Sequence, residues 1–404
     1  MDFTIKTRLQ RVKELTLKIE SYDRIPILFD GQDISAGCYG LAILDAFARP
    51  TSWEEALLLL KSHIKHQRDW VEINSTIRRL LDKGVLVPET HSIPSFRSKS
   101  RGFDAAVIHV KMLNDRLRTA GFLKAINSVV RAGDIVVDIG TGTGVLAVAA
   151  ARAGARHVYA IESTGIAKIA KEVFAANGLA EKITLVEGRS TSVNLPEKAD
   201  VMISETVGNH PFGEGILETV ADATKRLLKP GARMIPAAVE FFGIPVHIPD
   251  AVMDAQCITD NTLHNWREWY GIDFVPLKNA SCKVPTQSSF HSNEAALWQP
   301  LAEPARLASV NLSDNRNNSF HNTTKVEIET EGILNGILSY FELALDTDVR
   351  LSTHPQIAGK DNSWKNMVWL LPCPVNLLKG EHLSVTFNYR MVDATDGITV
   401  EKFL

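Results

Sequence analysis

The residues best suited to chemistry lie in a glycine-rich loop that runs from Asp138 to Gly144 (DIGTGTG). The loop follows a short apolar run and precedes a helical pattern, so it lies where ligands meet the carboxyl ends of parallel strands. Gly140 and Gly142 let the backbone approach a ligand closely. The carboxylate of Asp138 disfavours a pyrophosphate, because like charges repel, and suits a ligand that carries an ammonium group.

A second acid, Glu162, ends the next strand-like run. An acid at this place can accept hydrogen bonds from both hydroxyls of a ribose. A GxGxG sequence alone fits any tight turn between a strand and a helix, but an adenosine with a cationic amino-acid tail satisfies both Asp138 and Glu162. The residues therefore predict S-adenosylmethionine as the cofactor.

Upstream, four side chains recur every third residue in a helical segment, and they are His109, Met112, Asp115 and Arg118. This spacing places them on one side of the helix. The planar fork of Arg118 could hold a ligand carboxylate through two hydrogen bonds. Taken alone, such a stripe is more often a solvated or core-facing surface of a helix.

Two further carboxylates, Glu205 and Glu214, bracket the loop SETVGNHPFGE. Its Gly, Pro and second Gly are typical of a hairpin that brings the two acids together. Neighbouring carboxylates raise each other's pKa unless a cation lies between them. A guanidinium, with five donors in a fixed fork, is suited to that place. Without a cation, the two would be ordinary exposed loop acids.

The surrounding patterns indicate the elements that must position these residues. Short apolar runs at 135–138, 157–162, 183–186 and 201–204 are separated or followed by helical segments near 145–153, 164–176 and 216–228. Strands alternating with helices predict a parallel sheet. From about residue 237 the pattern changes to strict alternation, as at 325–329 and 383–389, which predicts an antiparallel sheet or barrel. The irregular stretch 257–300 is rich in aromatic residues and suits an interface.

These motifs, in this order, resemble the protein arginine N-methyltransferases over about residues 103–404. Glu205 and Glu214 match the double-Glu loop of that family, and His109, Met112 and Arg118 match its signature helix. Asp138, Gly140, Gly142 and Glu162 match its S-adenosylmethionine site, and 228–236 matches the run into its β-barrel. The resemblance implies a Rossmann-like class I methyltransferase domain (103–236), an antiparallel β-barrel that binds the acceptor (237–404), a dimerisation arm at about 257–300, and a homodimer.

The sequence departs from the family where the acceptor would bind. Phe103 and Lys99 occupy the places of two tyrosines, and Thr206 and Asn209 replace aromatic residues in the double-Glu loop. The Thr-His-Trp loop of the family is Asn362-Ser363-Trp364, so Trp364 is kept and the histidine is lost. The expected acceptor pocket contains Phe103, Asn209 and Trp364. These departures predict an intact cofactor site and a remodelled acceptor site.

Residues 1–90 fall outside that core, and 91–102 reads as a polar linker. A strand-like run at 25–31 precedes helical segments near 37–48, 52–60 and 73–83, and Thr51 and Glu54 have the spacing of a capping box. Helix, helix and β-tail predict a small α+β winged-helix-like domain, which is similar to the PqqD-like modules that bind leader peptides. A DNA-reading winged helix is disfavoured, because residues 1–90 carry equal numbers of basic and acidic side chains. A packing module is the remaining alternative.

Composition narrows the class of protein. The 404 residues carry a net charge of −3 and are 45% hydrophobic, which is ordinary for a globular chain and lacks the basic excess of a nucleic-acid-binding surface. The four cysteines show no CxxC spacing, so neither a disulfide framework nor a metal site is expected. No segment is long and apolar enough to span a membrane, and the first twenty residues lack a signal-peptide core. A cytoplasmic protein is expected.

Three functional hypotheses remain open. The first is S-adenosylmethionine-dependent N-methyl transfer to the guanidino nitrogen of free arginine or of an arginine-containing peptide, with Glu205 and Glu214 as catalytic residues. In the second, the same fold methylates histidine or a small-metabolite amine in peptide or natural-product biosynthesis. In the third, the chain is a catalytically silent partner that binds the cofactor. Retention of both glutamates favours catalysis.

Overall fold

In a computed structural model, the protein is described at residues 6–12, 15–17, 25–29, 32–88, 103, 105–281, 286–314, 319–390 and 395–403. The chain divides into two compact units, residues 1–99 and 100–404. The predicted linker 91–102 lies outside the described residues, as does Lys99.

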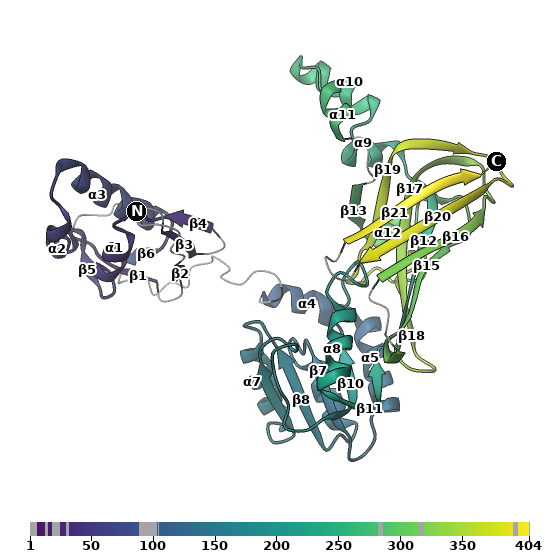
Figure 1. Cartoon of the computed structure of the whole chain (residues 1–404), viewed down its shortest axis with the longest axis horizontal. Coiled ribbons are helices and arrows are strands. Elements are labelled where there is room, and N and C mark those ends of the chain that lie inside the picture. Colours follow the sequence, from purple (N-terminus) through teal and green to yellow (C-terminus); the bar gives the residue numbers. More distant parts are fainter. Residues whose placement is uncertain are drawn as a thin grey trace. The chain divides into compact units, whose positions relative to one another are not determined.

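Within its described residues, the first unit contains three α-helices and two small sheets, which are labelled in Figure 1. Helices α1 (Gly40–Ala46), α2 (Trp53–Leu59) and α3 (Gln67–Asp82) pack on a sheet whose order is β5 (Thr51–Ser52), β1 (Arg8–Arg11) and β6 (Leu86–Pro88). The short strands β2 (Thr16–Leu17), β3 (Pro26–Phe29) and β4 (Gln32–Ser35) form a second sheet. The expected order of helices and β-tail is present, and the winged-helix assignment stays a prediction.

Two local predictions in this unit are corrected, one by a single residue and the other by six residues. The capping box of α2 is made by Ser52 and Glu55, because the Ser52 hydroxyl accepts the Glu55 N–H and the Glu55 carboxylate accepts the Ser52 N–H. Helix α3 begins at Gln67, earlier than predicted, because Asp69 accepts two backbone N–H groups ahead of it and so caps the first turn.

The second unit opens with helices α4 (Ala106–Asn114) and α5 (Arg116–Val129) and then a parallel five-stranded sheet. The strand order is β11 (Leu228–Ile235), β10 (Ala199–Ser204), β7 (Ile135–Ile139), β8 (His157–Glu162) and β9 (Ile183–Glu187). Helices α6 (Val145–Arg152), α7 (Ala167–Ala176) and α8 (Ile216–Arg226) connect the strands. This confirms the Rossmann-like arrangement, in which β7 is buried throughout because both faces of the sheet are covered.

The C-terminal half consists of two antiparallel sheets. The larger contains β12 (Ala238–His247), β13 (Thr286–Phe290), β14 (Gln299–Pro300), β15 (Ala305–Asn311), β17 (Gly332–Ala344), β18 (Arg350–Ser352) and β19 (Asn366–Leu377), with β12 and β17 at its centre. The smaller contains β16 (Ser319–Glu327), β20 (His382–Arg390) and β21 (Thr395–Phe403). Strand pairing among the described residues does not close into a ring, so the expected barrel is an open, two-sheet arrangement here.

Two helices of the predicted arm, α10 (Asp260–Tyr270) and α11 (Val275–Ser281), extend away from the larger sheet (Figure 1), and α9 (Asp250–Gln256) precedes them. The short α12 (Ser292–Ala295) instead packs on the sheet, because Ala295 shares a buried apolar cluster with residues of β12, β17 and β19. Trp269 and Tyr270 at the end of α10 are 63% and 61% exposed. No helix among the described residues has the length and apolar character to cross a membrane.

Candidate active site

The glycine loop lies at the carboxyl end of β7, where the sequence placed it. Gly140 and Gly142 have φ values of +76° and +56°, which glycine adopts without strain. A Cβ on Gly142 would lie 3.2 Å from the His109 ring, so α4 approaches the loop directly. The structure therefore brings the predicted glycine loop and the predicted helix of His109 together.

Asp138 carries an unfilled hydrogen-bonding position in the floor of this loop. The residue is 1% exposed, and its Oδ2 accepts the Thr141 hydroxyl at 2.6 Å. Its Oδ1 is buried and has no hydrogen-bond partner among the described residues. Burial, with a smaller contribution from the nearby Glu162, raises the pKa of Asp138 to about 7, although the Thr141 hydroxyl and the Ala147 backbone N–H act to lower it. A cation at Oδ1 would relieve this burial cost, so the site fits an ammonium group.

Glu162 is oriented by the backbone around it. Its Oε2 accepts the Gly142 N–H at 2.9 Å, and its Oε1 accepts the N–H groups of Ser163 and Thr164 at 2.9 and 2.8 Å. A carboxylate offers about four acceptor positions, so about one stays free in this arrangement. Two ribose hydroxyls would need the Gly142 N–H to be released.

The signature helix contributes two polar anchors. The Nε2 of His109 lies 2.7 Å from the backbone oxygen of Phe103, whose side chain is 45% exposed. Asp115 begins α5 by accepting the Arg118 N–H at 3.1 Å. Met112 and the glycine loop line a cavity of about 50 Å³ between α4, α5 and β7. Ligand sites are usually about 300–1,000 Å³, so this cavity by itself would hold only a part of a cofactor.

Arg118 is paired within the protein. Its guanidinium forms a salt bridge with Glu205, and the two side chains are 8% and 9% exposed. The guanidinium carbon lies 5.1 Å from the centre of the Trp364 ring, in cation–π range. Burial lowers the pKa of Arg118 to about 10, while Asp115 and Glu214 act to raise it, so the side chain stays charged at neutral pH.

The two loop glutamates differ in their surroundings. Glu205 is occupied by Arg118, whereas Glu214 is exposed on one side and has no ion pair among the described residues. Glu214 packs over Gly208, where a Cβ would lie 2.8 Å from its Oε1. Burial raises the pKa of Glu214 and Arg118 lowers it, with a net rise.

A loop from the C-terminal half fixes this region from the other side. The Trp364 indole N–H donates to the Val207 carbonyl at 2.7 Å, and the Asn209 side chain accepts the Lys365 N–H at 2.8 Å. Trp364 is 7% exposed. Of the three expected acceptor-pocket residues, Trp364 and Asn209 therefore meet at the double-Glu loop, whereas the backbone oxygen of Phe103 contacts His109.

Sequence reasoning missed the partner of Asp115. Ser363, where the family has a histidine, donates its N–H and its hydroxyl to the Asp115 Oδ2 at 2.8 and 2.9 Å. The lost histidine is thus replaced by a non-titrating donor that still joins the C-terminal half to α5. The signal was present as Asn362-Ser363-Trp364, but a contact between residues so far apart in the chain has no local pattern.

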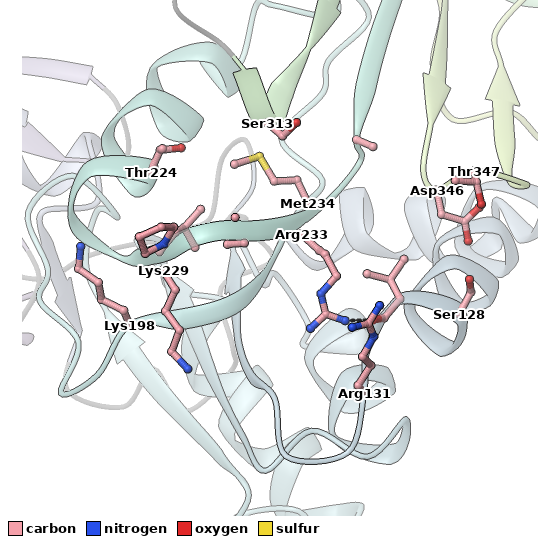
Figure 2. A pocket seen from close by; sticks show the side chains of 16 residues that line it. Ser128, Arg131, Lys198, Thr224, Lys229, Arg233, Met234, Ser313, Asp346 and Thr347 are labelled. Atoms are coloured by element: carbon pink, nitrogen blue, oxygen red, sulfur yellow. Dashed lines mark hydrogen bonds between the residues drawn. The ribbon is translucent and has the colours of Figure 1, made fainter.

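A separate groove of about 860 Å³ lies between β11, the end of α5 and the turn after β17, and contains none of the predicted site residues (Figure 2). Four basic side chains line it, and they are Arg131, Lys198, Lys229 and Arg233. Lys229 pairs with Asp200 at 2.9 Å and Arg233 with Asp134 at 2.7 Å.

Among the described residues, no group of three or more His, Cys, Asp or Glu could hold a metal ion.

Comparison with known proteins agrees with this geometry. The family model described as ribosomal protein L11 methyltransferase matches residues 117–240, and the arginine methyltransferase oligomerization subdomain matches residues 248–396. Protein arginine N-methyltransferase 6 of Xenopus laevis is 30% identical over 65% of this chain and 78% of its own length. The chain belongs to the protein arginine N-methyltransferase family of S-adenosylmethionine-dependent methyltransferases.

Other relatives show how far the likeness extends. A probable protein arginine N-methyltransferase 6 of Arabidopsis thaliana is 33% identical, but the match spans 51% of this chain and 47% of that relative. The solved Trypanosoma brucei PRMT1 enzyme–prozyme heterotetrameric complex with AdoHcy has a TM-score of 0.62 and 22% identity, covering 75% of this chain and all of that one. At this sequence identity, the likeness to the Trypanosoma brucei structure shows a shared fold and nothing further.

Proposed function

We propose that the protein transfers a methyl group from S-adenosylmethionine to a guanidino nitrogen of arginine, free or within a peptide. The observation that carries the proposal is the unpaired carboxylate of Glu214 beside the buried Arg118–Glu205 pair. Glu205 and Glu214 lie on the loop that follows β10, at the same sheet edge as the unpartnered oxygen of Asp138.

Asp138, Glu162 and the glycine backbone would hold the cofactor, with His109 and Met112 packed against it. When bound, the cofactor supplies an electrophilic methyl group. Asp138 would accept the ammonium at its free Oδ1. Arg118 would hold the carboxylate of the cofactor, as the sequence predicts, only by sharing its guanidinium with Glu205.

The acceptor cation would bind between Glu214 and Glu205. The pKa of Glu214 is raised, and a charged guanidinium beside it would lower this pKa and stabilise the ionised carboxylate. Each charge-assisted hydrogen bond contributes about 1.5–3 kcal/mol. Alignment of one nitrogen with the methyl group could lower the barrier by about 7–11 kcal/mol. Trp364 and Asn209 would support this alignment by fixing the loop, and Phe103 would border the entrance.

The test uses methyl-labelled S-adenosylmethionine with free arginine and, separately, an arginine peptide pool, with products read by mass. We expect a product that is heavier by one methyl group (+14 in mass) with free arginine or with the peptides. Its rate of formation should be lower by about tenfold or more in Glu214→Gln, which is the effect of one charge-assisted hydrogen bond. Glu172→Gln on α7, also an exposed glutamate, is the matched control and should keep full activity. Label only on histidine or an amine would favour the second acceptor class, and cofactor binding without any turnover would favour the silent partner.

We also propose a homodimer formed through the arm. The exposed Trp269, Tyr270 and Ile272 at the end of α10 support it, as does the match of residues 248–396 to an oligomerization subdomain. Light scattering should give twice the chain mass, and Trp269→Ser with Tyr270→Ser should give the monomer. A wild-type monomer at micromolar concentration would contradict the proposal.

For residues 1–90 we propose the PqqD-like role of docking a peptide that carries the acceptor. The support is the order of three helices and a short three-stranded sheet. If this is right, a substrate peptide should protect backbone amides within 25–88 from hydrogen exchange, while free arginine should not. Protection confined to 100–404 would leave residues 1–90 as a packing module.

A further inference from the structure

His210 lies in the middle of the double-Glu loop and is held between the two C-terminal sheets. Its ring centre lies 5.0 Å from that of Phe241 on β12 and 6.1 Å from that of Tyr389 on β20. The side chain is 13% exposed. The loop that carries the two glutamates is therefore fastened into the aromatic core at this residue.

The hydrogen bonds of His210 define which nitrogen carries the proton. Its Nδ1 accepts the backbone N–H of Phe212 at 3.3 Å, so Nδ1 is unprotonated and the hydrogen of the neutral ring is on Nε2. The Nε2 is buried without a hydrogen-bond partner and faces Asp396 of β21 at 3.5 Å. The Tyr389 hydroxyl donates to the Phe212 carbonyl at 3.3 Å and so holds the same segment.

We propose that His210 is a positioning residue that keeps the loop of Glu205 and Glu214 in its acceptor-binding form, and that it does so only while its imidazole is neutral. A second proton on Nδ1 would place two donors face to face and break the bond to Phe212. Because Glu214 lies two residues beyond Phe212, release of this segment displaces the acceptor-binding carboxylate. The proposal rests on the proposed function for its effect on turnover.

The charged neighbours set the pH at which the ring takes up this proton. Burial lowers the pKa of His210 and Asp396 raises it, with a net lowering, so the neutral form persists below the ordinary range of histidine. On β20, the phenol of Tyr389 stays protonated, since burial, Glu218 of α8 and Asp396 raise its pKa to about 12. Gln287 of β13 donates to Asp396 and holds that carboxylate in place. Among the residues that the structure describes, strand β12 contributes the uncharged ring of Phe241 to these contacts.

The first test measures kcat and the acceptor KM between pH 5.5 and 8.5. In the wild type, acceptor KM should rise at low pH through two protonations, at Glu214 and His210. His210→Phe keeps the ring and removes both nitrogens, so its KM should be about fivefold higher at pH 8, the effect of one hydrogen bond, and its rise should involve one proton fewer. His210→Asn supplies an oxygen near the Nδ1 position and should recover KM at pH 8 while also losing that proton.

Two controls make the result specific. His354→Phe removes another half-buried histidine with a lowered pKa, one that packs on Tyr340 away from this loop, and should keep the wild-type profile. Cofactor affinity measured by calorimetry should be the same in all variants. Unchanged KM and an unchanged pH profile in a folded His210→Phe protein would overturn the proposal.

A second measurement needs no turnover. Nitrogen-15 spectra of histidine-labelled protein, assigned with His210→Phe, should show the tautomer with hydrogen on Nε2 and an imidazole pKa below that of free histidine. A hydrogen on Nδ1 would overturn the proposal. If the wild type methylates no arginine acceptor, the proposed function fails, and this spectrum together with pH-dependent proteolysis of the 205–214 loop still decides the role of His210.

Discussion

Replacing Asp138 with asparagine should make the cofactor-free protein more stable at pH 8 and abolish cofactor binding. The pKa of Asp138 is raised from 3.8 to about 7 by burial. Since each unit corresponds to about 1.36 kcal/mol, ionising this carboxyl in the folded protein costs about 4 kcal/mol. Asparagine keeps the size of the side chain and removes the charge.

The sign follows from proton uptake. Between pH 4 and 7 the folded state holds a proton at Asp138 that the unfolded state has lost, so wild-type stability falls as pH rises through this window. Asp138→Asn lacks this fall. Between pH 5 and 8 the stabilities of the two proteins should diverge by about 3 kcal/mol. Burial of the new amide lowers the stability of Asp138→Asn equally at both pH values and does not change this divergence.

The measurement is scanning calorimetry of both proteins at pH 5 and 8, with and without S-adenosylhomocysteine, following the transition of the larger unit. The ligand should stabilise the wild type and leave Asp138→Asn unchanged. Asp200→Asn, on the neighbouring strand β10, is the matched control of opposite sign. Burial raises the pKa of Asp200, but the Ile135 N–H and Lys229 lower it by more, so this variant should lose stability at pH 8. Parallel pH curves for wild type and Asp138→Asn would refute the reasoning.

Three further outcomes follow from the geometry. Gly144→Ala should destabilise the larger unit by about 2–4 kcal/mol in calorimetry, because φ is +88° and a Cβ would lie 2.3 Å from the Phe174 ring. Gly133→Ala, with φ +92° and open space around the Cβ, measures the cost of the backbone conformation alone. Equal losses of stability in the two variants would exclude a clash with Phe174. Trp364→Phe removes one hydrogen bond and should raise acceptor KM about fivefold without changing cofactor affinity; an equal loss of cofactor affinity would contradict this. The raised pKa of Glu214 should make acceptor kcat/KM fall as pH decreases, and a Glu214→Gln profile as steep as the wild type would contradict that assignment.

The sequence was sufficient for the Rossmann-like elements, because their signals are local. The runs at 135–138 and 157–162 are short, apolar and β-branched, and they became β7 and β8 with both ends within a residue. The glycine loop was placed correctly for the same reason. Its acid and its helix both lie within a few residues of the strand that positions them.

The rest depends on contacts that no local pattern encodes. The alternating strands of the C-terminal half predicted pairing but not whether the sheet closes, since closure depends on register between distant strands. The bond from Ser363 to Asp115 and the burial of His210 join different halves of the second unit. The salt bridge of Arg118 with Glu205 was also missed, because each residue had been assigned a ligand of its own.

The direction of the pKa shift separates acids that await a cation from acids that the fold already satisfies. Asp69 and Asp346 cap backbone N–H groups and Asp200 is paired with a lysine, and the pKa of each is lowered. Asp138 and Glu214 have few such partners, and the pKa of each is raised. The buried carboxyl of Asp138 is retained at a cost in stability, and acids whose pKa is raised in this way cluster at functional sites. Asp138 lies on β7, and Glu214 lies on the loop that follows the adjacent parallel strand β10. Asp138 is suited to the ammonium of the cofactor and Glu214 to the cation of the acceptor.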